Sequence, residues 1–259
     1  GSSTIIGPML PTNSSPSVST YCTFNIGGTA LTLEGPLTGD AILDKVTGAS
    51  PLTLNGNSPD CAGGILTSAG NLIVNGVLSN NLGVVINIGK FVVNGTLLGA
   101  GVTNGAAGAL AGSGSCAGPV DSAGTVFPGD TNVVGTLTVG SLVLQPNAPL
   151  SFELTGTNTV GSGTNDLLVV NGDLTVSGNP VTINPVGLLK IGPTYPYRLI
   201  NYTGNLIWNG DLAVTGPNNY LFTVDTNTPG QINIVASGGP PVWNGGSATV
   251  NNWSDPANW

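Results

Sequence analysis

Residues 52–56 read Leu-Thr-Leu-Asn-Gly, residues 72–76 read Leu-Ile-Val-Asn-Gly, and residues 91–95 read Phe-Val-Val-Asn-Gly. Residues 31–35, Leu-Thr-Leu-Glu-Gly, open the series, so the closing glycines at 35, 56, 76 and 95 are 21, 20 and 19 residues apart. Each unit places apolar residues two apart, which is the period of a β-strand, and ends at residues typical of tight turns. A nearly constant period of this length indicates one repeated supersecondary unit.

The repeat predicts an all-β fold, a parallel β-solenoid whose coils contain about 20 residues. Equivalent strands would stack about 4.8 Å apart, with their inward aliphatic residues forming one continuous core. Asn55, Asn75 and Asn94 would then form a column in which side-chain amides bond to one another. The alternative is an antiparallel β-sandwich, in which each Asn-Gly pair is a two-residue hairpin turn.

The Asn-Gly pair recurs later in the chain, in residues 168–172 and 206–210. We interpret every copy as the same corner of a coil, with glycine supplying a backbone of positive φ. This interpretation assigns a purely structural turn ladder, with no ligand, to ten residues. They are Asn55, Gly56, Asn75, Gly76, Asn94, Gly95, Asn171, Gly172, Asn209 and Gly210.

The composition narrows the range of partners. Charged residues make up 6% of the chain, the net charge is −8, and only four residues are basic. So few scattered cations cannot neutralise a row of phosphates, which argues against a nucleic-acid partner. No apolar run reaches the roughly 18 residues of a transmembrane helix, so we expect no membrane insertion. A surplus of Gly, Thr, Asn and Ser over Lys and Glu is typical of extracellular proteins.

The repeat also suggests how the chain is organised. We predict an N-terminal extension over residues 1–20, a single β-solenoid domain over residues 21–236, and a Trp-containing C-terminal tail over residues 237–259. The period is lost near residues 99–119, which are dominated by Gly, Ala and Ser. Because small residues bury little apolar surface, we expect an irregular insertion or a loosely packed coil there.

The chain lacks the residues of the commonest reactive centres. There is no histidine, which removes the ordinary Ser-His-Asp and Cys-His systems, and no two of the twelve acidic residues form a recognisable catalytic pair. We therefore predict no enzymatic activity, no catalytic residues, no cofactor and no metal site. Asp173 and Asp211 share the context Asn-Gly-Asp-Leu and are the weak candidates for calcium. Cys61 and Cys116 are the favoured disulfide, against three unpaired cysteines.

Four segments of the second half of the chain follow a common pattern. They are residues 127–129 (Phe-Pro-Gly), 135–139 (Gly-Thr-Leu-Thr-Val), 150–154 (Leu-Ser-Phe-Glu-Leu) and 165–169 (Asn-Asp-Leu-Leu-Val). With these segments the chain resembles the autotransporter-associated β-strand repeat family of bacterial surface proteins, and residues 243–245, Trp-Asn-Gly, look like the opening of a further module. The resemblance implies a right-handed parallel β-helix that is exported and displayed at the cell surface, and it supplies no catalytic residues.

These observations predict an extracellular structural or adhesive surface protein. A solenoid has open strand edges at its ends, so we expect head-to-tail assembly of the chain with itself into filaments. The assembly contacts expected in the terminal segments are Ile5, Ile6, Trp243, Trp253 and Trp259. The alternative is a β-helix that binds or cleaves polysaccharides. Surface glycans would then contact the aromatic residues Tyr195, Tyr197, Tyr202, Trp208 and Tyr220.

Overall fold

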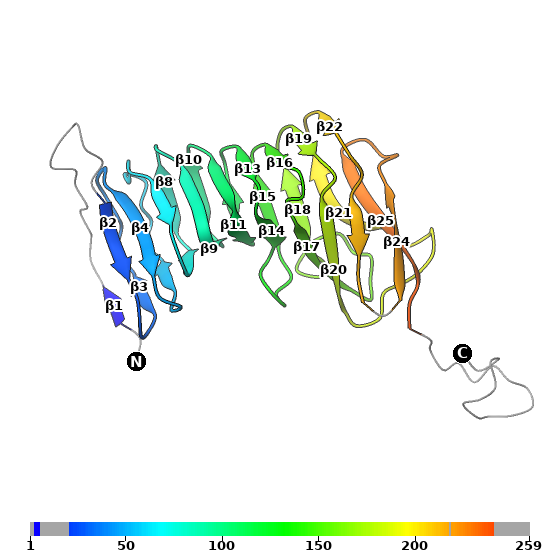
Figure 1. Ribbon diagram of the computed structural model, residues 1–259, viewed down its shortest axis with the longest axis horizontal. Helices are drawn as coiled ribbons and strands as arrows, with labels where there is room; N and C mark the ends of the chain where they lie inside the picture. The colour runs from blue at the N-terminus through cyan, green and yellow to red at the C-terminus, as the bar shows by residue number, and fades with distance from the viewer. Residues whose placement is uncertain (1–2, 6–20, 218, 241–259) are drawn as a thin grey trace, which may run out of the picture.

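The chain folds into an elongated rod of stacked β-coils (Figure 1). The structure, a computed structural model, describes residues 3–5, 21–217 and 219–240. Every regular element in these ranges is a β-strand. None of the described residues belongs to a helix that is long and apolar enough to cross a membrane.

Three stacks of strands surround one core. The first stack contains β1 (Ser3–Ile5), β3 (Leu31–Leu33), β5 (Leu52–Leu54), β7 (Asn71–Val74), the second halves of β9 (Val84–Val93) and β11 (Val102–Gly112), β14 (Thr125–Pro128), β17 (Leu150–Thr155), β20 (Pro180–Val186) and β23 (Ala213–Thr215). The second contains β2 (Tyr21–Asn25), β4 (Ile42–Thr47), β6 (Ile65–Thr67), the first halves of β9 and β11, β13 (Val120–Ser122), β16 (Leu142–Leu144), β19 (Leu174–Val176) and β22 (Leu206–Trp208).

The third stack ends differently from the other two. It contains β8 (Val77–Asn80), β10 (Thr96–Gly99), β12 (Ser115–Cys116), β15 (Thr136–Val139), β18 (Leu167–Val170), β21 (Tyr197–Tyr202), β25 (Gln231–Gly238) and β24 (Tyr220–Asp225). The strands are parallel as far as β21, but β25 pairs antiparallel with β21, and β24 antiparallel with β25. The sequence predicted one solenoid of parallel coils over residues 21–236, which is wrong for its last part, because β24 and β25 form an antiparallel hairpin beside β21.

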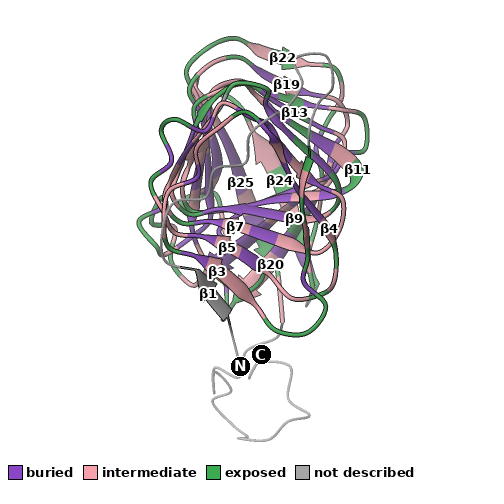
Figure 2. Ribbon diagram, turned by 90° about the vertical axis from the view of Figure 1, so that its left-hand side faces the viewer, coloured by how far each residue is buried: buried purple, intermediate pink, exposed green. Residues whose placement is uncertain are grey.

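The parallel pairing confirms the predicted β-solenoid and excludes the antiparallel sandwich. Leu31 pairs with Leu52, Leu52 with Leu72, and Leu72 with Phe91, so identical positions of successive repeats lie side by side. The inward-facing residues of these strands form the core, and Leu52, Leu72 and Phe91 are fully buried. Viewed from the N-terminal end, the buried residues line the interior (Figure 2). Burial of this aliphatic column is the main stabilising contribution.

The glycine of the Asn-Gly corner is required for a different reason from the one inferred from sequence. A Cβ atom at Gly76 would lie 2.2 Å from the carbonyl oxygen of Gly56, and one at Gly95 would lie 2.0 Å from that of Gly76. None of these three glycines has a positive φ, so the positive-φ interpretation is wrong. Glycine is needed because the backbones of successive coils approach too closely for any side chain.

The Gly/Ala/Ser-rich segment near 99–119 forms a regular coil, which corrects the expected insertion. The eleven-residue strand β11 lies here and pairs with β9 along both of its halves, with a bulge between Asn104 and Ala107. Backbone hydrogen bonds between coils do not depend on side-chain size, so small residues can continue the stack. Asn104 fills the space inside the corner, and its amide donates to Ser122 Oγ (2.9 Å) and to the Thr125 carbonyl (3.0 Å).

The coils contain about 20 residues only in the N-terminal half. Side chains bonded between neighbouring coils are 19 to 21 residues apart there, as in Asn94–Asn75 and Asn55–Glu34. In the C-terminal half the separation rises to 31 for Asp166–Gly135 and 33 for Asn184–Ser151. The corner between the first and third stacks accounts for most of this growth, because two residues (75–76) after β7 become 129–135, 156–166 and 187–196 after β14, β17 and β20.

The N-terminal boundary also differs from the prediction. Strand β1 pairs with β3, so residues 3–5 already belong to the first stack, although the sequence placed them in an extension. The C-terminal boundary lies close to the predicted one, because β25 ends at Gly238. Most of the predicted tail, residues 241–259, lies outside the described residues.

The crowded corner makes a specific prediction about stability. Gly76→Ala should lower the free energy of unfolding by about 1–3 kcal/mol, because the new methyl group meets backbone atoms that cannot move away. Gly28→Ala is the matched control, since no atom lies within 4 Å of the place that its methyl group would take, and it should change stability by less than about 0.5 kcal/mol. Urea unfolding followed by circular dichroism measures both. Equal losses in the two variants would contradict the close-approach explanation.

Candidate functional site

Three long loops occupy the same corner of successive coils. Residues 129–135, 156–166 and 187–196 connect the first stack to the third, at the position where the Asn-Gly pairs stand in the N-terminal half. They project on the lower side of the rod in Figure 1. We call these three loops the loop row. Loops held on a rigid scaffold are where binding surfaces are most often found, so the loop row is the candidate functional site.

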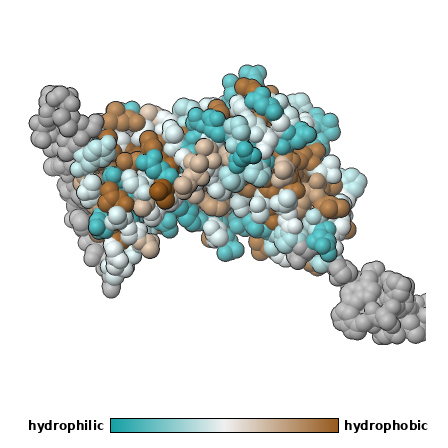
Figure 3. All heavy atoms as spheres, in the orientation of Figure 1, coloured by the Kyte–Doolittle hydropathy of each residue, from teal (hydrophilic) through white to brown (hydrophobic). Residues whose placement is uncertain are grey.

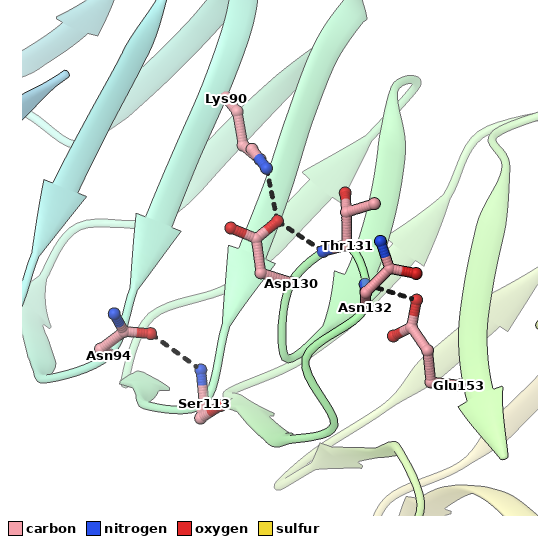
Figure 4. A network of polar contacts seen from close by, with 7 residues as sticks. All are labelled: Lys90, Asn94, Ser113, Asp130, Thr131, Asn132 and Glu153. Atoms are coloured by element: carbon pink, nitrogen blue, oxygen red, sulfur yellow. Dashed lines mark hydrogen bonds and ion pairs between the residues drawn. The ribbon is translucent and has the colours of Figure 1, made fainter. Parts of the chain in front are cut away.

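The 129–135 loop is a tight, internally bonded turn (Figure 4). Asp130 and Val133 exchange backbone hydrogen bonds of 2.9 Å, and Asn132 at the tip has a φ of 60°. The Asp130 carboxylate accepts the Thr131 N–H at 2.6 Å and forms an ion pair with Lys90 of β9. The Asn132 N–H donates to Glu153 Oε1 at 3.2 Å. These contacts fix the loop against β9 on one side and β17 on the other.

A pair of buried carboxyl groups holds the base of the loop row. Asp166 is fully buried, and its two oxygens accept the Gly135 N–H and the Glu153 N–H, both at 2.7 Å. Burial above all, together with a hydrogen bond to the Glu153 side chain, raises the pKa of Asp166 from 3.8 to about 8. The two backbone N–H groups act in the opposite direction, and repulsion from Glu153 contributes to the rise. At neutral pH the Asp166 carboxyl group therefore keeps its proton.

The 156–166 loop is closed by a single asparagine. Asn165 is buried, and its Nδ2 donates to the carbonyls of Thr157 and Thr159, each at 2.7 Å. Its Oδ1 accepts the Thr155 N–H at 2.6 Å. Because all these partners belong to the loop or to the strand before it, the side chain ties the two ends of the loop together. Asn165 and Asp166 are thus consecutive anchors of two neighbouring loops.

The 187–196 loop rests on two tyrosine hydroxyl groups and presents apolar side chains to solvent. The Leu189 N–H donates to the Tyr220 hydroxyl at 2.9 Å, and the Lys190 N–H donates to the Tyr197 hydroxyl at 2.8 Å. Above this base, Leu188 is 55% exposed and Ile191 50% exposed. They line a hollow of about 320 Å³. Exposed apolar side chains on a fixed backbone are suited to contact with a partner.

Apolar side chains also reach the surface elsewhere on the rod. Figure 3 shows hydrophobic side chains gathered toward both ends of the visible face, with a more mixed surface between them. In the N-terminal half, Tyr21, Leu82 and Val85 are exposed and line a hollow of about 200 Å³. The 187–196 loop differs from this surface in belonging to the loop row, and any binding test needs an apolar control pair from the N-terminal half.

The sequence-predicted asparagines occupy more than one corner. Asn75 Nδ2 donates to Asn55 Oδ1 at 2.9 Å, and Asn94 Nδ2 donates to Asn75 Oδ1 at 3.0 Å, so these three form a column. Asn171 follows β18 of the third stack, and Asn209 follows β22 of the second stack. The prediction that all five mark the same corner is therefore wrong. The local motif Asn-Gly does not reveal which of three corners it serves.

The predicted disulfide between Cys61 and Cys116 is not formed, and both thiols are free. Cys61 lies in the same coil as Ser58. Along the third stack Ser58 pairs with Leu78, Leu78 with Leu97, and Leu97 with Cys116. Three coil steps of about 4.8 Å place the cysteines roughly 14 Å apart, beyond the reach of a disulfide. Burial raises the pKa of the Cys116 thiol to about 12, which makes it unreactive at neutral pH.

The two calcium candidates also lie apart. Asp173 follows β18 and accepts the Asn205 N–H at 2.7 Å, whereas Asp211 follows β22 and accepts the indole N–H of Trp208 at 2.9 Å. They occupy different corners, so their shared sequence context does not bring them together. Within the described ranges, no group of three or more acidic or cysteine side chains could hold a metal ion.

The predicted aromatic residues are divided between core and surface. Tyr197 and Tyr220 are buried and Tyr202 packs against the core, so only Tyr195 and Trp208 offer partly accessible rings near hollows. Trp208 lines a hollow of about 420 Å³ at the C-terminal end of the rod, together with Asp211 and Phe222. The five aromatic residues therefore do not form the continuous glycan-contact surface that the sequence suggested, and only the region of Trp208 agrees with it.

Most of the expected assembly contacts lie beyond the part of the chain that the structure describes. Strand β1 contains Ile5, whose backbone pairs with that of Leu33. Ile6, Trp243, Trp253 and Trp259 lie outside the described residues. Sequence reasoning missed the loop row, including Leu188 and Ile191. The signal was present, because spacing between successive strand motifs grows beyond 20 residues after residue 128.

Comparison with known proteins finds a partial relative. No family model matches the chain. It is 40% identical over 116 residues to the adhesin BmaC autotransporter of Brucella suis biovar 1 (strain 1330). The match covers 44% of this chain and 3% of the relative, so the chain corresponds to a small part of that protein's length.

The carboxyl pair makes a prediction about pH. The folded chain holds a proton on Asp166 that the unfolded chain loses above about pH 4, so this pair makes stability fall as pH rises from about 4 to about 8. Glu153→Gln removes the second carboxyl group and should weaken this dependence in part, because repulsion from Glu153 adds to the larger effect of burial on the Asp166 pKa. The stability of this variant relative to the native chain should therefore grow with pH. Urea midpoints across this range measure the effect, with exposed Asp121→Asn as control. Parallel curves for the native and Glu153→Gln chains would contradict the effect of Glu153 on the Asp166 pKa.

Proposed function

We propose that the protein is an extracellular, surface-displayed adhesive protein in which the parallel β-helix is a rigid spacer and the loop row is the contact surface. The observation that carries this proposal is the combination of exposed Leu188 and Ile191 with the buried tyrosine hydroxyls that fix the loop beneath them. Similarity over 116 residues to an autotransporter adhesin supports an adhesive role and a cell-surface location.

The chemistry of the loop row favours binding over catalysis. The carboxyl oxygens of Asp166 both accept backbone N–H groups, so this carboxyl holds loops together instead of facing a substrate. The exposed part of the 187–196 loop is apolar, with the Lys190 ammonium placed 5.0 Å from the centre of the Tyr195 ring. Such a surface supports contact with a protein partner, in which apolar and aromatic side chains contribute most of the binding energy.

Head-to-tail filament formation stays a prediction. The two ends of the rod differ in size, because the coils contain 19–21 residues at the N-terminal end and 31–34 residues at the C-terminal end. At the C-terminal end the antiparallel hairpin of β24 and β25 continues the third stack. If one molecule stacked directly on the next, a large C-terminal coil would have to pair with a small N-terminal coil. This mismatch favours the terminal segments as the connectors between molecules.

Saccharides are a second partner class, and one feature favours them. Trp208 occupies the inward-facing position that Leu144 and Val176 hold in the two preceding coils, where both are fully buried. Trp208 itself is only half-buried, because it lies in the last strand of its stack. Its indole N–H is held by the exposed Asp211 carboxylate. A half-exposed aromatic ring beside a hydrogen-bonding carboxylate suits the apolar face and hydroxyl groups of a sugar.

An attachment assay tests the proposal. Beads coated with the protein are applied to monolayers of cultured epithelial cells. Leu188→Ser with Ile191→Ser should reduce attachment by about tenfold, because the apolar contacts of the loop row are lost. The matched control is Leu82→Ser with Ile88→Ser, which changes two aliphatic residues of the N-terminal half that are at least as exposed.

Circular dichroism confirms that both variants are folded. Unchanged attachment of the loop variant, or an equal loss in the control, would reject the loop row as the contact surface. Competition with soluble glycans separates the second partner class, since inhibition that disappears in Trp208→Ala would assign attachment to the C-terminal hollow instead.

A further inference from the structure

The Asn-Gly pairs share a chemical weakness that the fold distributes unevenly. In this dipeptide the glycine amide nitrogen can attack the asparagine side-chain carbon, Cγ, because no Cβ on the next residue hinders it. A C–N bond forms and ammonia leaves, which gives a cyclic succinimide. Water then opens the ring to aspartate or isoaspartate, so the net change is the loss of one ammonia and the gain of one water. Each event converts a neutral amide into a carboxylate.

Ladder contacts oppose this reaction at Asn75 and Asn94. The Asn75 amide is bonded on both sides, to Asn55 and to Asn94, so its Cγ cannot turn toward its own backbone without breaking these bonds. The attacking nitrogens are also occupied, because the Gly76 N–H donates to the Leu54 carbonyl (3.3 Å) and the Gly95 N–H to the Val74 carbonyl (3.0 Å). Both reactants must therefore be released before they can meet.

Two further pairs are restrained in other ways. Asn104 is 1% exposed, and its Nδ2 donates to Ser122 Oγ and to the Thr125 carbonyl. Asn55 is held between Glu34 and Asn75 by its side chain, with Nδ2 donating to Glu34 Oε1 at 2.9 Å. Reaction at either asparagine requires the loss of at least two side-chain hydrogen bonds.

Asn171 and Asn209 have none of this protection. Both are exposed, and neither side chain has a hydrogen-bond partner among the described residues. The Gly172 and Gly210 N–H groups likewise have no acceptor within that part of the chain. Only the asparagine backbones are fixed, through N–H groups that donate to Val139 and Val176 carbonyls at 2.8 Å. The side chain and the attacking nitrogen are therefore both free to react.

We propose that Asn171 and Asn209 are sites of spontaneous deamidation in the folded protein, and that the ladder protects Asn75 and Asn94 from the same reaction. Water is the only co-reactant. The reaction is independent of the proposed adhesive function, because it depends on hydrogen bonding at the corners alone.

The modification would change the surface near two existing carboxylates. Asp173, two residues after Asn171, accepts the backbone N–H of Asn205 at 2.7 Å. Asp211, two residues after Asn209, holds the Trp208 indole. A new carboxylate at either corner adds negative charge beside these contacts and, as isoaspartate, lengthens the backbone. Deamidation at Asn209 would thus alter the hollow that contains Trp208.

Peptide mapping by mass spectrometry tests this proposal. The folded full chain is incubated in mildly alkaline ¹⁸O-labelled water, and the rate of label incorporation is measured at each Asn-Gly pair. Asn171 and Asn209 should react at least about tenfold faster than Asn75 and Asn94, because the latter must first open two or more hydrogen bonds. In denaturant all four rates should converge.

Two variants keep the test decisive. Asn55→Ala removes one partner of Asn75 and should accelerate its deamidation, while leaving Asn171 unchanged. Asn171→Gln should abolish incorporation at that peptide without affecting Asn209. Equal rates at ladder and non-ladder sites in the folded chain, or slower reaction at Asn171 and Asn209, would overturn the proposal.

Discussion

The structure depends on backbone lying directly on backbone at the corner between the first and third stacks. Carbonyl oxygens of one coil lie where a Cβ of Gly76 or Gly95 in the next would be, so only glycine permits the contact. The asparagine before each glycine then bonds to its counterpart in the next coil. Together these contacts set the register in which aliphatic residues of successive coils meet, and burial of that column stabilises the rod.

The loop row begins where this constraint ends. After β14 the two-residue corner is replaced by longer loops, and buried polar groups take over the role of the ladder. The Asp166 carboxyl group accepts a backbone N–H from the coil before it. In the N-terminal half, the Asn75 side chain likewise bonds to the coil before it, through Asn55. Stability therefore resides in the stack and its anchors, and exposed residues such as Leu188 are free to serve recognition.

The sequence predicted the parts of the fold that depend on periodicity. The 19–21-residue repeat predicts parallel coils and the column of Asn55, Asn75 and Asn94, because a regular period requires equivalent neighbours. It could not predict the coil at 99–119, where backbone bonding continues without large side chains. It also could not distinguish the corner of Asn171 from that of Asn75, since both have the same local motif. The candidate site was missed because the residues that anchor it are recognisable only once distant coils are stacked.

Distances between spin labels along one stack test the coil stacking most directly. Thr23, Val85, Val143 and Ile207 are exposed and lie in one outward-facing column of the second stack, three, six and eight coils apart from Thr23. At about 4.8 Å per coil, double electron–electron resonance should give distances from position 23 of about 14 Å to position 85, 29 Å to position 143 and 38 Å to position 207. Distances that do not rise in proportion to coil number would contradict the stacked parallel rod.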